Sequence, residues 1–159
     1  MQDNPFDQRR FATDPSDVAG HEGAVIRVLL VEDDLVDSTW VRRQLLSYAG
    51  VRFHLAVASR LEWALQHMDS AFFDAVLLDL SLPDSHGGET LLRTLMHSSR
   101  VPVLILSGNR DQHLSESARQ RGVYAYLVKG MSTMAMLPRI LHEAVMERRQ
   151  APMEDGEGQ

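Results

Sequence analysis

The stretch VLLVEDD, residues 28–34, joins a short apolar run to three consecutive acidic residues. The apolar part belongs to a run over residues 26–31 that is rich in valine, isoleucine and leucine, a composition typical of strands buried on both faces. Similar runs follow at residues 53–57, 75–78, 103–106 and 124–128. The sequence therefore predicts five strands.

The segments between these runs carry apolar residues at helical spacing, which predicts five helices. The apolar stripes are Val36, Trp40, Val41 and Leu45; Leu61, Ala64, Leu65 and Met68; Leu91, Leu92, Leu95 and Met96; Leu114 and Ala118; and Met136, Leu137, Ile140, Leu141, Ala144 and Val145. Ser59 and Glu62 predict a capping box at the start of the second helix. Pro138 predicts that the last helix begins near Met134 or Ala135, because proline disrupts a helix interior.

The strict alternation of strands and helices predicts an α/β fold in which helices cover both faces of a parallel sheet. Five strands suit a doubly wound (βα)5 flavodoxin-like sandwich, with a five-stranded parallel sheet in the order 2-1-3-4-5. A length of 159 residues suits one such domain, which we predict over residues 24–149. Polar composition with proline and glycine predicts a flexible N-terminal extension over residues 1–23 and a disordered C-terminal tail over residues 150–159.

The composition narrows the classes of function. The formal net charge is −6, and lysine and arginine do not cluster with aromatic residues, which argues against a nucleic-acid partner. The absence of cysteine excludes disulfides, thiolate catalysis and cysteine-ligated zinc. No apolar run reaches membrane-spanning length and no signal-peptide core is present near the start, so we expect a cytoplasmic protein without a membrane partner.

Polar side chains follow the predicted strands where a doubly wound sheet binds its ligands, at the carboxyl ends of the strands. They are Glu32, Asp33 and Asp34 after the first strand, Asp79 after the third, Ser107 after the fourth and Lys129 after the fifth. Carboxylates brought together repel one another unless a cation compensates, and oxygen ligands favour Mg²⁺ (or Mn²⁺). The lysine and the hydroxyl would bind an anion. The set predicts a phosphoryl site with a carboxylate nucleophile.

Four runs together carry a resemblance to a known family: VLLVEDD (28–34), LLDLSLPD (77–84), LILSGN (104–109) and YLVKG (126–130). In this order and spacing the chain resembles the response-regulator receiver family over roughly residues 25–148. Gly130 departs from the family pattern, in which proline commonly follows the lysine. The resemblance implies the same flavodoxin-like fold.

The resemblance also implies a role for each matching residue. Asp79 would be the phosphoacceptor, Asp33 a direct metal ligand, Glu32 an acid acting mostly through metal-bound water, and the Ser81 carbonyl a further ligand, with Asp34 a neighbour only. Ser107 would bond a phosphoryl oxygen, Lys129 would pair with the phosphoryl charge, and Tyr126 would be the aromatic switch residue.

A receiver of this kind would serve a two-component system or phosphorelay, with a sensor histidine kinase or a histidine phosphotransfer protein as donor. It would reach an effector or a second copy of itself through the fourth helix, fifth strand and fifth helix. We expect only self-phosphorylation and self-dephosphorylation, not an enzyme. A dehalogenase-like phosphatase would need an aspartate where Ser81 stands, and acids replace the phosphate loop of a flavin binder. A phosphorylation-independent pseudo-receiver stays open as the alternative.

Overall fold

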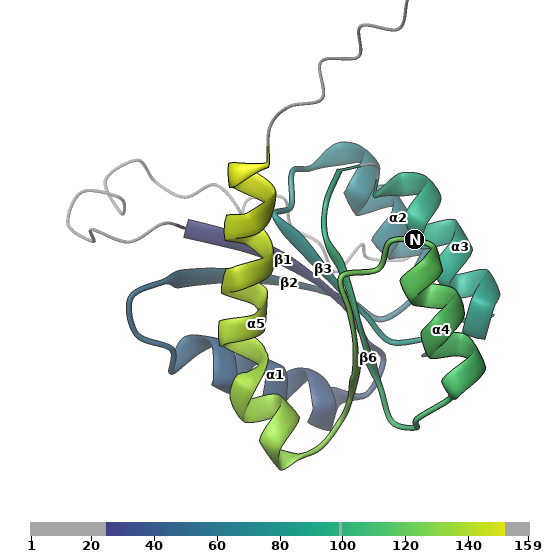
Figure 1. Cartoon of the computed structure of the whole chain (residues 1–159), viewed down its shortest axis with the longest axis horizontal. Helices are drawn as coiled ribbons and strands as arrows, with labels where there is room; N and C mark the ends of the chain where they lie inside the picture. The colour runs from purple at the N-terminus through teal and green to yellow at the C-terminus, as the bar shows by residue number, and fades with distance from the viewer. Residues whose placement is uncertain (1–24, 99, 152–159) are drawn as a thin grey trace, which may run out of the picture.

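A computed structural model describes residues 25–98 and 100–151 (Figure 1). The predicted extension over residues 1–23 lies outside the described residues, as do residues 152–159 of the predicted tail. The last helix includes Gln150, the first residue of that predicted tail. Within the described ranges, no helix combines the length and the apolar character needed to cross a membrane.

Five parallel strands form one sheet in the order β2-β1-β3-β6-β7. They are β1 (Val25–Val31), β2 (Arg52–Ala58), β3 (Ala75–Leu78), β6 (Val103–Ser107) and β7 (Ala125–Val128). Because β6 and β7 are the fourth and fifth strands of this sheet along the chain, the predicted order 2-1-3-4-5 and the fold class are confirmed. A two-stranded antiparallel hairpin, β4 (Ser81–Leu82) with β5 (Ser85–His86), was not predicted.

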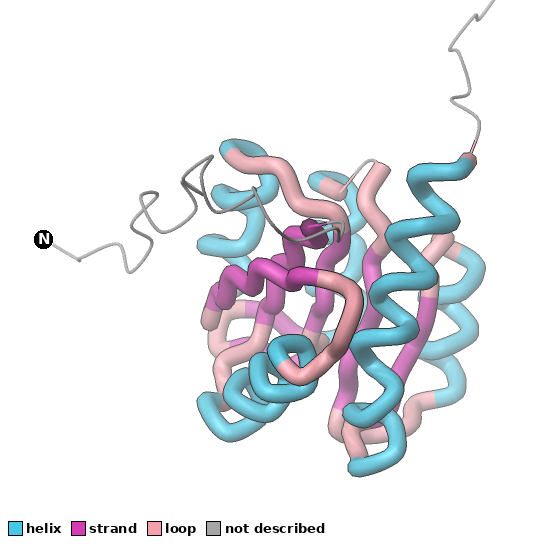
Figure 2. The backbone as a smooth tube through the Cα atoms, turned by 90° about the vertical axis from the view of Figure 1, so that its left-hand side faces the viewer, coloured by secondary structure: helices cyan, strands magenta, loops and turns pink. Residues whose placement is uncertain are grey.

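Helices cover both faces of the sheet, whose strands lie between them in Figure 2. The helices are α1 (Leu35–Leu46), α2 (Leu61–Ser70), α3 (Gly87–His97), α4 (Gln112–Gln120) and α5 (Met131–Gln150). Helices α1 and α5 pack with one core, which takes Val28 and Leu30 from β1, and α2, α3 and α4 pack with the other, which takes Leu29 and Val31. Strand β1, which lies between β2 and β3, is thus apolar on both faces, as its run of valine, isoleucine and leucine predicts.

The predicted start of α5 is wrong, because the helix begins at Met131 and Pro138 is its eighth residue. Pro138 is buried and cannot donate the backbone hydrogen bond that its position would otherwise supply. Met134 and Leu137 are buried on the same core as Leu141. Packing of these first turns against the sheet therefore outweighs the loss of one hydrogen bond.

The apolar stripes were also assigned imprecisely, since Val36 is 75% exposed and Leu92, Met96 and Met136 are exposed as well. The buried faces instead include small polar residues, namely Ser38 in α1 and Thr90 and Thr94 in α3. These hydroxyls are satisfied locally: Thr90 Oγ1 donates to Ser85 Oγ at 2.7 Å, and Thr94 Oγ1 donates to the Thr90 carbonyl at 2.8 Å. The sequence prediction counted only apolar residues, so it placed the buried faces of these helices at the wrong angle around the helix axis.

The predicted capping box at α2 is wrong as well, because the N-cap residue is Arg60 and its side chain makes no capping bond. The cap comes from Asp84, in the hairpin between β4 and β5, whose two carboxylate oxygens accept from the backbone N–H groups of Leu61 at 2.9 Å and Glu62 at 3.0 Å. Partial burial alone would raise the pKa of Asp84, but these two hydrogen bonds hold it below its ordinary value. Asp84 therefore ties the hairpin to the start of α2.

Replacing Asp84 with alanine should lower the free energy of unfolding by about 1 kcal/mol, the usual effect of removing a helix cap. Because the folded-state pKa is depressed, this stabilisation is present above the ordinary pKa of 3.8 and is lost as the pH falls through the folded value. Urea denaturation across that pH range measures it. Glu116→Ala, which removes an exposed carboxylate of α4, is the control. Equal destabilisation by both variants at pH 7 would contradict the cap.

Candidate functional site

A cavity of about 730 Å³ opens at the carboxyl ends of β1, β3, β6 and β7. We call it the strand-end cavity. All of the predicted site residues line it: Glu32, Asp33, Asp79, Ser81, Ser107, Tyr126 and Lys129. The parallel topology explains this convergence, since every strand of the sheet ends at the same edge.

Three acidic side chains meet in the strand-end cavity. Glu32 and Asp79 are 2% and 7% exposed, Asp33 is exposed, and one carboxylate oxygen from each lies within 4.8 Å of the other two. Strand pairing fixes the backbone at two of them, because Glu32 N donates to the Ala58 carbonyl at 3.0 Å and Asp79 N donates to the Val31 carbonyl at 2.9 Å. Oxygen atoms at this separation suit a hard divalent cation such as Mg²⁺.

The hairpin after β3 orients the Asp79 carboxylate. Asp79 Oδ1 accepts from the Ser81 backbone N–H at 3.0 Å. The same loop is closed by Gly87, whose N–H donates to the Leu80 carbonyl at 2.8 Å and whose positive φ of 56° suits glycine. One Asp79 oxygen is therefore held by the loop, and the other faces the lysine.

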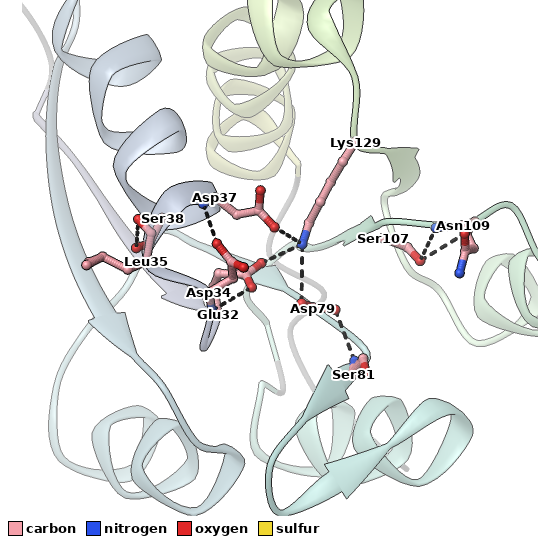
Figure 3. Close-up of polar contacts among 10 residues, drawn as sticks. All are labelled: Glu32, Asp34, Leu35, Asp37, Ser38, Asp79, Ser81, Ser107, Asn109 and Lys129. Carbon is pink, nitrogen blue, oxygen red and sulfur yellow. Dashed lines mark hydrogen bonds and ion pairs between the residues drawn. The ribbon is translucent and has the colours of Figure 1, made fainter.

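Lys129 places its ammonium among the carboxylates, as Figure 3 shows. Its Nζ donates to Glu32 Oε2 at 2.8 Å, to Asp37 Oδ2 at 2.8 Å and to Asp79 Oδ2 at 3.3 Å. Among the residues that line the strand-end cavity, Lys129 is the single lysine or arginine. The sequence prediction missed Asp37, which lies one helical turn beyond Asp34, the N-cap of α1, because nothing in that spacing points to Lys129.

The close packing of these charges shifts two pKa values. Burial raises the pKa of Glu32 from its ordinary 4.5 to about 7, with the hydrogen bond from Lys129 opposing the shift and the charge of Asp79 adding to it. Burial alone would lower the pKa of Lys129, but its hydrogen bonds with Asp37 and Glu32 reverse the shift and raise it. Lys129 is therefore charged at neutral pH, whereas Glu32 changes its charge near neutrality.

Ser107 and Tyr126 also line the strand-end cavity and share one partner. Ser107 Oγ donates to the Asn109 carbonyl at 3.0 Å and accepts from the Asn109 N–H at 3.3 Å. The Tyr126 hydroxyl donates to the same carbonyl at 3.2 Å. The two predicted switch residues are thus linked through the backbone of Asn109, which the sequence did not single out.

Residues 28–141 match the family model described as the response regulator receiver domain. The chain belongs to this family. The recognition from the four sequence runs is therefore confirmed, and with it the assignment to two-component signalling.

Individual receiver relatives agree with the assignment. The chain is 34% identical over 119 residues to the nitrate/nitrite response regulator protein NarL of Escherichia coli, covering 74% of this chain and 53% of NarL. It is 29% identical over 137 residues to the methanogenesis regulatory protein FilR1 of Methanothrix harundinacea, covering 84% of this chain and 30% of FilR1. The chain thus spans about half or less of the length of these curated relatives.

A solved receiver structure also superimposes on the chain. It is the receiver domain of the sensor histidine kinase PA1611 from Pseudomonas aeruginosa, whose description states that a magnesium ion is coordinated in its active-site cleft. The TM-score is 0.64 at 28% identity, covering 76% of this chain and 98% of that one. The receiver fold is therefore shared.

Proposed function

We propose that the receiver accepts a phosphoryl group on Asp79 from a phosphohistidine donor, either a sensor histidine kinase or a histidine phosphotransfer protein. The observation that supports this most directly is the position of Lys129 Nζ, 3.3 Å from an Asp79 oxygen within a cluster of acids. A phosphoryl group on Asp79 would lie beside the one lysine that lines the strand-end cavity. The proposal keeps the cytoplasmic location that the sequence predicts.

The acids of the strand-end cavity fit a divalent cation. Glu32, Asp33 and Asp79 would hold Mg²⁺ or Mn²⁺, with the Ser81 carbonyl as a further oxygen ligand, and the magnesium described in the PA1611 receiver supports this. When bound, such a cation would offset the negative charge of the carboxylates and of the phosphoryl oxygens. Binding should be weak without phosphate, because Mg²⁺ gives up its water shell reluctantly.

The transfer itself needs only positioning by the chain. An oxygen of the Asp79 carboxylate bonds to phosphorus as the P–N bond of the donor breaks, and the electron pair stays on nitrogen. The donor ring, protonated on its other nitrogen, leaves as neutral imidazole. The Ser81 N–H orients Asp79, Lys129 pairs with phosphoryl charge, and the Ser107 hydroxyl can turn to a phosphoryl oxygen. Hydrolysis by water reverses the modification, and no other substrate is turned over.

Incubation with phosphoramidate tests this function. With Mg²⁺ present, intact mass spectrometry should show the gain of one phosphoryl group, and chelation of Mg²⁺ by EDTA should prevent it. The pseudo-receiver alternative makes the opposite prediction. If the wild-type protein gains no phosphoryl group from phosphoramidate or from any histidine donor, the chain is a phosphorylation-independent interaction module.

We further propose that α4, β7 and α5 transmit the phosphorylation state to an effector or a second copy. Moving Ser107 toward a phosphoryl oxygen breaks its bond to the Asn109 carbonyl, which also binds the Tyr126 hydroxyl. Helix α4 can follow at little cost, since Ala118 is its one fully buried residue among those described. Addition of beryllofluoride should shift backbone amide signals across residues 111–128. Shifts confined to the cavity loops would rule this surface out.

A further inference from the structure

Asp37 contacts the ammonium of Lys129 as closely as Glu32 does. Both distances are 2.8 Å, whereas the distance from Lys129 Nζ to Asp79 Oδ2 is 3.3 Å. An ammonium group has three N–H donors, and three carboxylates occupy them here. The lysine is therefore saturated before any phosphoryl group arrives, and its shorter contacts are not those with Asp79.

A phosphoryl oxygen can bind Lys129 only after one of these carboxylates gives way. Glu32 and Asp79 belong to the acidic cluster that fits a cation, and their side chains are 1% and 10% exposed. Asp37 lies outside that cluster, and its side chain is 27% exposed, so water can solvate it once the lysine leaves. Asp37 is therefore the partner that is displaced most easily.

A structural role alone does not account for Asp37. An aspartate in the first turn of a helix is favourable there, but α1 already has a cap, because Asp34 Oδ1 accepts from the Asp37 N–H at 2.9 Å. The side chain of Asp37 points away from this cap and toward Lys129, as Figure 3 shows. Its carboxylate bridges α1 to the end of β7, across 92 positions of sequence.

We propose that Asp37 is a positioning residue that holds Lys129 in the unphosphorylated state and competes with the phosphoryl group for its ammonium. The inference rests on the proposed phosphorylation of Asp79 and adds a regulation of that site. Each phosphorylation event must exchange the contact between Lys129 and Asp37 for one between Lys129 and a phosphoryl oxygen. Asp37 thus lowers the phosphorylated fraction that a given donor concentration sustains.

The Asp37→Asn variant tests the competition with phosphoramidate as donor, in which the P–N bond breaks with its electron pair on nitrogen and ammonia leaves. At a subsaturating donor concentration the ratio of phosphorylated to unphosphorylated protein should rise roughly three- to tenfold, as expected for losing one partly exposed charged hydrogen bond. Asp34→Asn is the matched control, because it removes the same charge nearby, keeps a capping side chain and does not touch Lys129. Its ratio should stay within about twofold of wild type.

A second readout follows Lys129 without any phosphorylation. In nitrogen-15-labelled, metal-free protein, hydrogen exchange of the Lys129 ammonium with water should become faster in Asp37→Asn, unchanged in Asp34→Asn, and partly slowed again in Asp37→Glu. A ratio in Asp37→Asn that equals or falls below that of Asp34→Asn overturns the inference, as does unchanged ammonium exchange. Absence of phosphorylation in the wild type would instead refute the proposed function. The ammonium exchange would then still test whether Asp37 holds Lys129.

Discussion

The Asp79→Asn protein should gain no phosphoryl group from phosphoramidate under conditions that phosphorylate the wild type. The amide has nearly the same shape as the carboxylate, but its neutral oxygen is a poor nucleophile. Two neighbouring carboxylates are poor substitutes: Glu32 is buried with a pKa raised to about 7, and Asp37 is bound to Lys129. Intact mass measured over the full time course reports the result.

Asp111→Asn is a suitable control for this experiment. Asp111 also lines the strand-end cavity, where it caps α4 by accepting from the Leu114 N–H at 3.1 Å, and asparagine keeps that cap. This variant should be phosphorylated like the wild type. A phosphoryl group on the Asp79→Asn protein at the wild-type rate would show that another carboxylate is the acceptor.

Of the variants described, Lys129→Met should lower the free energy of unfolding the most. Without the ammonium, Glu32, Asp37 and Asp79 lose their shared partner, and two of these acids are buried. Removing one member of a buried charged group costs several kcal/mol, and partial exposure of the lysine reduces this to about 2–3 kcal/mol at pH 8 without metal. Urea denaturation measures the loss. Arg139→Met, which breaks an exposed ion pair with Glu143, is the control and should cost under about 0.5 kcal/mol.

The loss in Lys129→Met should depend on pH and on Mg²⁺. Glu32 has a folded-state pKa of about 7, above its ordinary 4.5, so the native state binds more protons between these values and gains stability as the pH falls through that window. Without Lys129 this pKa rises further, so the variant should recover stability as the pH falls from 8 toward 5. Added Mg²⁺ should also reduce the difference from wild type. A loss that is constant with pH would show that methionine disturbs packing instead of charge.

The strands could be predicted almost to the residue from the sequence, because buried parallel strands are continuous apolar runs. Each predicted strand boundary lies within one residue of the observed one. The hairpin of β4 and β5 could not be predicted, since two-residue strands leave no periodicity to read. The predicted start of α5 was wrong for a different reason. The burial of Met134 and Leu137 outweighs the backbone hydrogen bond that Pro138 cannot donate.

The site residues at strand ends could be found from the sequence because topology alone gathers them at one edge. Asp37 and Asp84 could not, although each makes two or more contacts that shape the site or its loop. Asp37 lies in the first turn of α1 and Asp84 in the turn between β4 and β5. Their partners are 92 and 23 positions away, so no local pattern connects them. Their assignments depend on side-chain direction, which only the folded chain determines.

The cap that Asp84 provides for α2 has a consequence for anyone who recombines receivers. The start of α2 and the loop that follows Asp79 are built from segments on either side of β3, and their shared hydrogen bonds require a fixed spacing between Asp79 and Asp84. A chimera that lengthens this loop by one residue would displace Asp84 from the backbone N–H groups of Leu61 and Glu62 and leave the helix uncapped. Anyone who recombines receivers should therefore keep Asp84 and the number of residues that separates it from Asp79.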